Sequence, residues 1–238
     1  MHFIEVIGAS GTGKSTLTQA LAKRAGYVPV IETEDDLNNL PFFEEYMKDP
    51  AKHAFEGAMN FLAYHLNRMQ EGIHNAPEGT NAVIVDNSLL LQYAYGLATL
   101  DDEELDIAFR IIERGYEKLP QLSLRIVIDL PIDEHVKRVQ GRGRNSDKTV
   151  PVSFLEGTQV SIIKALEFFD DQVPTIIIDG EKFDWLNSPE DVDDIIKVIN
   201  ETLEEYGALF NDLSEKRHST ETPEARDWRR RQKHDYVF

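Results

Sequence analysis

Short runs of apolar residues alternate along the chain with longer segments whose apolar positions recur at intervals of three or four. The short runs are typical of buried strands, whereas the longer segments predict amphipathic helices. The predicted strands are residues 3–7, 27–31, 82–85, 124–129 and 175–178. The predicted helices are residues 15–24, 41–69 with a break at Asp49-Pro50, 89–97, 101–119, 132–140, 154–169 and 192–206. This alternation favours an α/β fold in which a five-stranded, mainly parallel sheet carries helices on both faces.

The composition changes near residue 210. We expect residues 1–210 to form a single α/β domain, for which this length provides a substantial core. Residues 211–238 form a polar tail that contains three consecutive arginines, Arg229 to Arg231. We interpret the tail as a loosely ordered terminus, with docking onto the body or onto a partner as the alternative.

The overall composition excludes several classes of protein. The chain has no cysteine, which excludes disulfides and thiolate metal sites, and its formal net charge of −18 opposes general attraction to nucleic acid or to an anionic membrane. A predicted strand begins almost directly after Met1, and no apolar run approaches the length that spans a bilayer. We therefore expect a cytoplasmic protein without membrane contact.

A Gly-rich segment between the first predicted strand and helix matches the phosphate-binding loop G-x-x-x-x-G-K-[ST] in full. In this context backbone N–H groups and the helix dipole favour an anion. Lys14 is expected to reach the terminal phosphates, and the Ser15 hydroxyl to ligate Mg²⁺. We therefore predict binding of ATP or GTP with Mg²⁺. The residues expected to contact the nucleotide are Gly8, Ala9, Ser10, Gly11, Thr12, Gly13, Lys14, Ser15 and Thr16.

Two carboxylates follow predicted strands that would end at the same sheet edge as the Gly-rich loop. Asp86 follows the third strand and is the natural second ligand for Mg²⁺, with a helix N-cap as the alternative. Glu32 ends the second strand, where a carboxylate can take a proton from an acceptor hydroxyl during phosphoryl transfer. The alternative for Glu32 is a solvated charge in an acidic stretch.

A basic segment lies late in the chain, where Arg138 is on a predicted helix and Arg142 and Arg144 flank a glycine. Such a segment can close over a triphosphate and bring guanidinium groups to the charge that develops during transfer. The alternative is an exposed basic turn. The guanine-reading Asn-Lys-x-Asp pattern of GTPases does not occur in the sequence.

In their order and spacing these motifs resemble those of the deoxynucleoside kinases, which phosphorylate the 5′-hydroxyl of deoxyribonucleosides. The resemblance covers roughly residues 3–205 and implies a P-loop kinase fold with an Arg-rich lid over residues 138–144. It implies that Glu32 is the general base, that Tyr46 and Glu156 contact the sugar, and that the helix carrying Phe55 lines the base pocket. Lys14 and the arginines of the lid would stabilise the transferring phosphoryl group.

The sequence departs from the family pattern on the acceptor side. Ala58 stands where the family has a Gln that hydrogen-bonds the nucleobase, so recognition passes to Asn60, to Gln92 or to shape. Asn87 replaces the Arg of the family's Asp/Glu-Arg-Ser triplet. Because that Arg holds the general base, either another cation takes its place or the acceptor lies differently.

We accordingly predict an enzyme that transfers a phosphoryl group from ATP, with Mg²⁺, to the 5′-hydroxyl of a deoxyribonucleoside in an atypical base pocket. One alternative is a kinase for a nucleoside monophosphate, or for a hydroxymethylated base in a nucleotide or in DNA, although the net charge weighs against DNA. Another is a nucleotide-binding subunit without catalysis. Similar kinases are dimers, so the resemblance also implies a homodimer that packs through residues 42–69 and 101–119.

Overall fold

The computed structural model describes residues 1–49, 52–142, 152–169 and 173–214. Two compact units are distinguished, Met1–Ile199 and Asn200–Phe238. In the second unit the described residues continue the helix that closes the first. A domain boundary at residue 210 stays a prediction, since most of residues 211–238 lies outside the described part of the chain.

The sheet has five strands in the order β2-β3-β1-β4-β5, and every neighbouring pair is parallel. The bounds are β1 (His2–Ile7), β2 (Val28–Val30), β3 (Ala82–Val85), β4 (Leu124–Asp129) and β5 (Thr175–Asp179). The central strand β1 is buried along almost its whole length, as expected for a parallel sheet covered on both faces. The predicted α/β fold and its five strands are confirmed.

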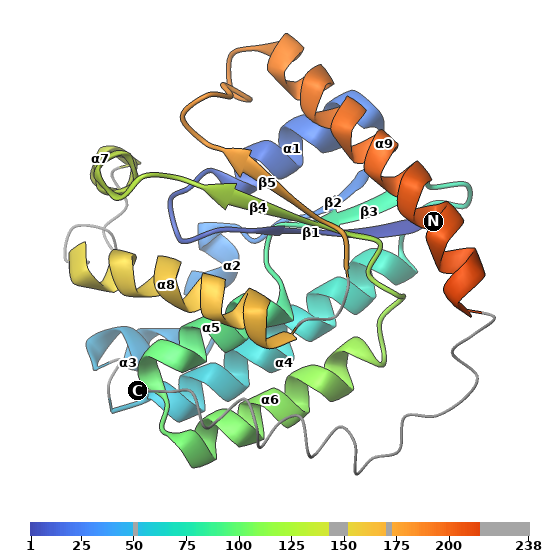
Figure 1. Ribbon diagram of the computed structural model, residues 1–238. Helices are drawn as coiled ribbons and strands as arrows, with labels where there is room; N and C mark the ends of the chain where they lie inside the picture. The colour runs from blue at the N-terminus through green and yellow to red at the C-terminus, as the bar shows by residue number, and fades with distance from the viewer. Residues whose placement is uncertain (50–51, 143–151, 170–172, 215–238) are drawn as a thin grey trace. The chain divides into compact units, whose positions relative to one another are not determined.

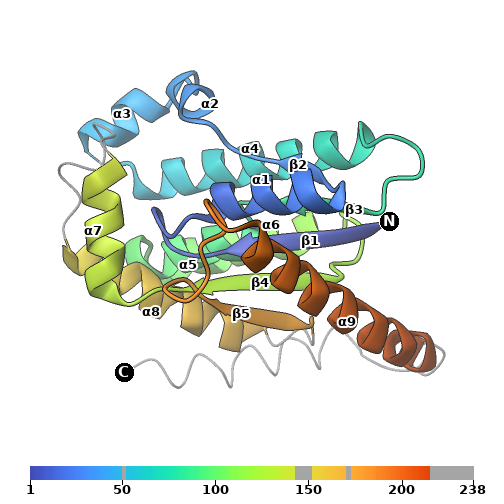
Figure 2. The ribbon, with the colours of Figure 1, turned by 90° about the horizontal axis from the view of Figure 1, so that it is seen from above.

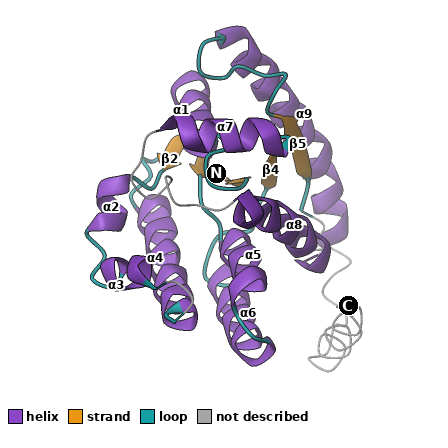
Figure 3. Cartoon of the chain, turned by 90° about the vertical axis from the view of Figure 1, so that its left-hand side faces the viewer, coloured by secondary structure: helices purple, strands orange, loops and turns teal. Residues whose placement is uncertain are grey.

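The helices lie on both faces of the sheet and at the carboxyl ends of the strands (Figures 1 and 3). Helix α1 covers one face, while α4, α5, α6 and α8 cover the other. The bounds are α1 (Lys14–Ala25), α2 (Glu34–Asn38), α3 (Phe43–Lys48), α4 (Ala54–His74), α5 (Leu89–Thr99), α6 (Asp102–Tyr116), α7 (Ile132–Arg142), α8 (Val152–Phe169) and α9 (Pro189–Ser214). Among the described residues, no helix combines the length and the apolar character that crossing a membrane requires.

The sequence pattern did not predict α2. This helix has five residues and buries none of them, so it carries no apolar periodicity. Its start is stabilised by a capping box, in which the Thr33 hydroxyl accepts from the Asp36 N–H and the Asp36 carboxylate accepts from the Thr33 N–H. The predicted break at Asp49-Pro50 is confirmed, because α3 ends at Lys48 and α4 starts at Ala54.

A continuous hydrophobic core lies between the sheet and the α4-α5-α6-α8 layer. It joins Phe3 and Val83 of the strands to Leu62 of α4, Leu90 of α5 and Ile162 of α8. Figure 2 shows that α2, α3 and α7 gather at one end of the strands. Because all strands are parallel, the loops that follow them open at that same end, where ligands bind in such sheets.

Candidate active site

A cavity of about 940 Å³ opens at the carboxyl ends of the strands. It is lined by the Gly-rich loop, by the residues after β2, β3 and β5, and by side chains of α3, α4, α5 and α7. The structure brings together most of the predicted site residues, which come from segments far apart in the sequence. Those that line the cavity are Ser10, Gly11, Gly13, Lys14, Ser15, Thr16, Glu32, Tyr46, Ala58, Asp86, Asn87, Gln92 and Arg138.

The Gly-rich loop has the backbone conformation that its glycines permit. Gly11 and Gly13 have φ of 92° and 99°, in the left-handed region that other residues rarely adopt. The Lys14 ammonium donates to the Ala9 carbonyl at 3.1 Å, and the Thr12 hydroxyl donates to the same oxygen at 2.9 Å. Helix α1 has no acidic residue of its own in its first turn, and the positive end of its dipole faces the loop.

Two contacts brace this loop from outside the motif. A Cβ at Gly13 would lie 3.0 Å from Cζ2 of the buried Trp185, so the indole packs directly against the loop. His135 of α7 is fully buried. Its Nε2 lies 2.7 Å from the Ser10 carbonyl oxygen, and its Nδ1 lies 3.3 Å from Nε2 of Gln159. A carbonyl only accepts, so Nε2 carries the proton and Nδ1 accepts from Gln159. The sequence analysis did not single out these residues, because they belong to no local motif.

Arg138 is the one arginine of the predicted lid whose side chain the structure describes. Its guanidinium donates to the Gly180 carbonyl at 2.8 Å and to Glu134 at 3.1 Å, at the cavity wall. Arg142 is the last residue of α7, and its side chain lies outside the described part of the chain, as does the whole of Arg144.

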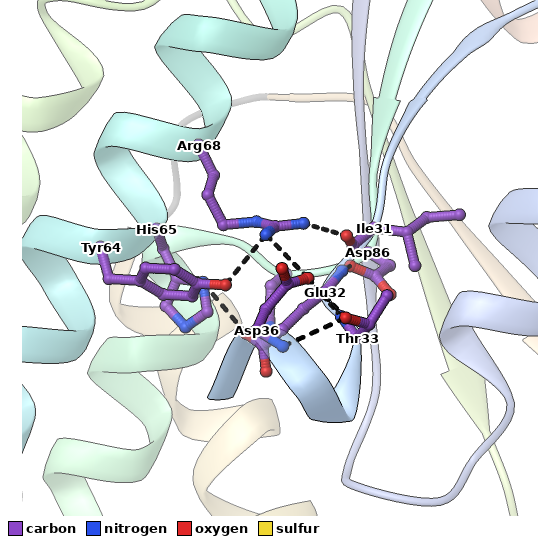
Figure 4. Close-up of polar contacts among 9 residues, drawn as sticks. Ile31, Glu32, Thr33, Asp36, Tyr64, His65, Arg68 and Asp86 are labelled. Carbon is purple, nitrogen blue, oxygen red and sulfur yellow. Dashed lines mark hydrogen bonds and ion pairs between the residues drawn. The ribbon is translucent and has the colours of Figure 1, made fainter. Parts of the chain in front are cut away.

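The two predicted carboxylates lie side by side (Figure 4). The Glu32 N–H donates to Oδ1 of Asp86 at 3.2 Å, and the Asn87 amide donates to Oε2 of Glu32 at 3.0 Å. Burial and the neighbouring Asp86 charge raise the pKa of Glu32 to about 7, against the opposing effects of Arg68 and Lys14. Burial also raises the pKa of Asp86, while a hydrogen bond from Ser15 and the Lys14 charge act against this shift.

These oxygens fit Mg²⁺ that arrives with a nucleotide. The described residues contain no group of three or more His, Asp or Glu side chains that could hold a metal by themselves. Mg²⁺ instead takes one or two protein oxygens and completes its octahedral shell with water and phosphate oxygens. Ser15 and Asp86 are hydrogen-bonded to each other and both line the cavity, so they provide such a pair.

The part of the cavity beside α3 and α4 is aromatic. The Phe61 ring on α4 makes edge-to-face contacts with Phe42 at 5.0 Å and with Tyr46 at 5.5 Å between ring centroids. Gly57 permits this arrangement, because a Cβ there would lie 2.5 Å from Cδ2 of Tyr46. Helix α3 therefore packs closely on α4, and together with α5, which carries Gln92, these helices wall the cavity.

Three predicted acceptor-binding residues are not brought to the cavity. Helix α4 presents Ala58 and Phe61 to it, whereas Phe55 and Asn60 point from other sides of the same helix. The Asn60 amide donates to the Glu56 carbonyl of its own helix at 2.8 Å. Glu156 is exposed on α8 and does not line the cavity. Helical spacing alone did not distinguish the side of α4 that faces the cavity.

Helix α4 also contributes two residues that the motifs did not indicate. His65 is buried, and its Nδ1 lies 3.5 Å from Oε2 of Glu32. Burial and the Arg68 charge lower the pKa of His65 to about 3, so its ring is neutral at neutral pH. The Arg68 guanidinium contacts Asp36, Tyr64 and the Ile31 carbonyl (Figure 4). Both residues share a side of α4 with Phe61, and that spacing was the only signal in the sequence.

Comparison with known proteins agrees with this geometry. Residues 4–204 match the family model described as deoxynucleoside kinase. The chain is 28% identical over 220 residues to a deoxyguanosine kinase from Lactobacillus johnsonii, covering 89% of this chain and 97% of that protein. It is 26% identical over 217 residues to a deoxyadenosine kinase from Lactobacillus acidophilus, covering 88% and 100%.

A solved structure shares the fold. The deoxyadenosine kinase from M. mycoides with bound dCTP superposes with a TM-score of 0.64 at 21% identity, covering 84% of this chain and 99% of that one. The predicted P-loop kinase fold is thereby confirmed. From the family match and the converging phosphate loop and carboxylates, we conclude that the chain belongs to the deoxynucleoside kinase family and is an enzyme that phosphorylates deoxynucleosides.

Proposed function

We propose that this kinase transfers the γ-phosphoryl group of ATP to the 5′-hydroxyl of a purine deoxyribonucleoside, with Glu32 as the general base. The observation that carries the proposal is that Glu32 lies in the same cavity as Lys14 and is hydrogen-bonded by Asn87. The purine is supported by the names of the relatives, a deoxyguanosine and a deoxyadenosine kinase. Ala58 presents only a methyl group to the cavity, which leaves room for a base of that size.

The part of the cavity beside the Gly-rich loop would bind the negatively charged triphosphate of the donor. The backbone N–H groups of the loop and the start of α1 would surround the phosphates, and Lys14 would contact the terminal ones. Ser15 and Asp86 would hold Mg²⁺, which neutralises charge on the β- and γ-phosphates when bound. Arg138 lies at the cavity wall and would stabilise the charge on the transferring group.

On the acceptor side, Glu32 would take the proton of the 5′-hydroxyl as the new P–O bond forms and the bond to the β-phosphate oxygen breaks. A carboxylate with a pKa of about 7 is a stronger base than an ordinary Glu and is still half ionised at neutral pH. Tyr46 would contact the sugar, Phe61 would lie against the base, and the Gln92 amide would hydrogen-bond its edge.

Labelled ATP with Mg²⁺ and a panel of acceptors tests the proposal: the four deoxynucleosides, their monophosphates and DNA with a hydroxymethylated base. We expect transfer to deoxyguanosine or deoxyadenosine, and a loss of about 100-fold or more in kcat for Glu32→Gln. Asp35→Asn is the matched control, because it makes the same carboxylate-to-amide change at an exposed position of the same segment. Transfer to monophosphates or DNA alone would overturn the acceptor assignment.

We also propose that the protein forms a homodimer, as the family resemblance implies. Helices α4 and α6 are neighbours, and α6 leaves Ile107 and Ile111 exposed by 46% and 39%. Two large apolar side chains exposed one turn apart on α6 are consistent with a face that a second copy of the chain covers. Sedimentation should then give the mass of two chains, and Ile111→Asp should give the mass of one.

A further inference from the structure

Arg68 contacts the chain on both sides of Glu32 (Figure 4). One amino group of its guanidinium donates to the carbonyl of Ile31, the residue immediately before Glu32. The other lies 3.0 Å from the carboxylate of Asp36, which closes the capping box of α2 just after Glu32. Glu32 is therefore carried by a short segment whose two ends are held by one side chain.

The Arg68 side chain is itself fixed. It projects from α4, a helix of 21 residues that packs into the core through Leu62 and Met69. Its guanidinium lies 5.4 Å from the centre of the Tyr64 ring and donates to the Tyr64 hydroxyl at 2.9 Å. A planar guanidinium can reach several acceptors in different directions at once, which the single ammonium of a lysine does less well.

The charges around Glu32 show why a fixed cation is needed there. Asp86 faces it from the end of β3, Lys14 from α1, and the neutral His65 with Tyr64 and Arg68 from α4. The carboxylates of Glu32 and Asp86 repel each other, and Lys14 is placed to be compensated by phosphate when the donor binds. Arg68 does not line the cavity, so its charge lies beside the carboxylates and away from the space that the phosphates would fill.

We propose that Arg68 is the positioning residue for Glu32: it holds the Ile31 carbonyl before Glu32 and the Asp36 carboxylate after it, and it supplies the positive charge that Asn87 does not. This inference rests on the proposed role of Glu32 as general base. Arg68 acts through Glu32 and does not touch the substrate. It fills, from a different helix, the need for a cation that the replacement of the triplet Arg by Asn87 creates.

Steady-state kinetics of Arg68→Gln and Arg68→Lys test the proposal. We expect Arg68→Gln to lower kcat about 10- to 100-fold, because a displaced base loses its alignment with the acceptor hydroxyl. The kcat of Arg68→Lys should lie between those of Arg68→Gln and the wild type, because lysine restores the positive charge but cannot make all the contacts of the guanidinium. The KM for ATP should stay within about two-fold, because Arg68 makes no contact with the phosphate loop.

The matched control is Arg24→Gln, which removes an arginine paired with Asp193 at 2.5 Å at the exposed end of α1 that lies away from the phosphate loop. It should leave kcat and both KM values unchanged. Should Arg68→Gln fail to fold, Asp36→Asn keeps the test open, because it weakens the contact after Glu32 and leaves the Ile31 contact in place. For Asp36→Asn we expect a loss of about 3- to 10-fold in kcat.

The decisive measurement combines Arg68→Gln with Glu32→Gln. If Arg68 acts through Glu32, it adds less than about a three-fold loss once Glu32 has been removed, because coupled residues are not additive. A full 10-fold or greater loss in both backgrounds would overturn the proposal. An unchanged kcat in Arg68→Gln would overturn it as well. An unchanged kcat in Glu32→Gln would instead overturn the proposed general base, which separates the two failures.

Discussion

At the residue scale, Glu32 and His65 form a pair whose protonation changes on folding. In the unfolded chain their pKa values are near 4.5 and 6.5, so between these pH values Glu32 is ionised and His65 carries a proton. In the folded protein the pKa values are about 7 and about 3, so Glu32 holds the proton and His65 is neutral. Each state binds one proton, and the pair contributes little net pH dependence to stability.

Replacing either member of this pair should make the free energy of unfolding depend on pH, with slopes of opposite sign in the two variants. In His65→Leu, folded Glu32 binds a proton that the unfolded chain lacks, so stability relative to wild type falls as pH rises from 4.5 toward 7. In Glu32→Gln, the unfolded chain binds a proton at His65 that the folded protein lacks, so relative stability falls as pH drops below 6.5. The slopes should approach about 1.4 kcal/mol per pH unit in opposite directions. Urea unfolding at three pH values between 5 and 6.5 measures them, and parallel curves for the two variants would contradict the prediction.

A second prediction at this scale concerns the phosphate loop. Gly13→Ala forces a side chain into the left-handed region at φ 99°, which costs about 1–2 kcal/mol, and places a Cβ 3.0 Å from Trp185. We expect ATP binding, measured by calorimetry, to weaken at least about 10-fold as the loop shifts. Gly26→Ala is the control: its φ is 71° and a Cβ there meets nothing within 4 Å, so it should lower stability and leave ATP affinity unchanged. Equal ATP affinity in both variants would contradict the role of the loop conformation.

At the scale of elements, the acceptor wall depends on the close approach of α3 to α4. Gly57 lies inside α4, where alanine would favour the helix by about 0.5–1 kcal/mol. A Cβ at this position would nevertheless lie 2.5 Å from the Tyr46 ring of α3, so the ring must move. Helix propensity and acceptor geometry therefore oppose each other at this residue.

Gly57→Ala should raise the KM for the deoxynucleoside about 10-fold or more and leave the KM for ATP within about two-fold. The displaced Tyr46 is on the acceptor side only, which is why the donor is spared. Gly157→Ala is the matched control on α8, because a Cβ there meets nothing within 4 Å. It should stabilise the protein and change neither KM. An unchanged acceptor KM in Gly57→Ala would show that α3 does not shape the acceptor site.

At the scale of the whole molecule, a buried ion pair joins the two central strands. Glu5 of β1 and Arg125 of β4 are neighbours in register and are 0% and 2% exposed, with Nε of Arg125 3.6 Å from the Glu5 carboxylate. The Tyr116 hydroxyl of α6 donates to Glu5 at 2.8 Å and accepts from the Leu90 N–H of α5. The network thus connects the sheet to two helices of the covering layer.

Removing one member of this pair should destabilise the protein far more than removing both. Arg125→Met leaves the Glu5 carboxylate buried without its cation and should cost about 3–5 kcal/mol in the free energy of unfolding. The double variant Glu5→Leu/Arg125→Met no longer buries a carboxylate without its cation, so it should recover about half or more of the lost free energy of unfolding. Urea unfolding of the two single variants and the double variant measures this. A double variant as unstable as the sum of the singles would contradict the prediction.

The sequence by itself determined the five strands and the longer helices along the chain, the phosphate loop, and the carboxylates after β2 and β3. These features follow from local rules: apolar periodicity reports which side of an element is buried, and the Gly-rich motif needs only its own backbone to form an anion site. Strand β3 and strand β4 were predicted to the residue: β3 is an unbroken apolar run between Asn81 and Asp86, and β4 is a mostly apolar run that ends at Asp129. The family resemblance added the role of Glu32.

Only the tertiary structure decided which side of α4 faces the cavity, and which side chains surround Glu32. His65 and Arg68 belong to no motif, and they lie beside Glu32 because the sheet brings the end of β2 against α4. The same holds for His135 beneath the phosphate loop and for the Glu5–Arg125 pair between neighbouring strands. The physical reason is that such contacts join residues about 30 to 125 positions apart, where charge and burial depend on packing and leave no periodic signal along the chain.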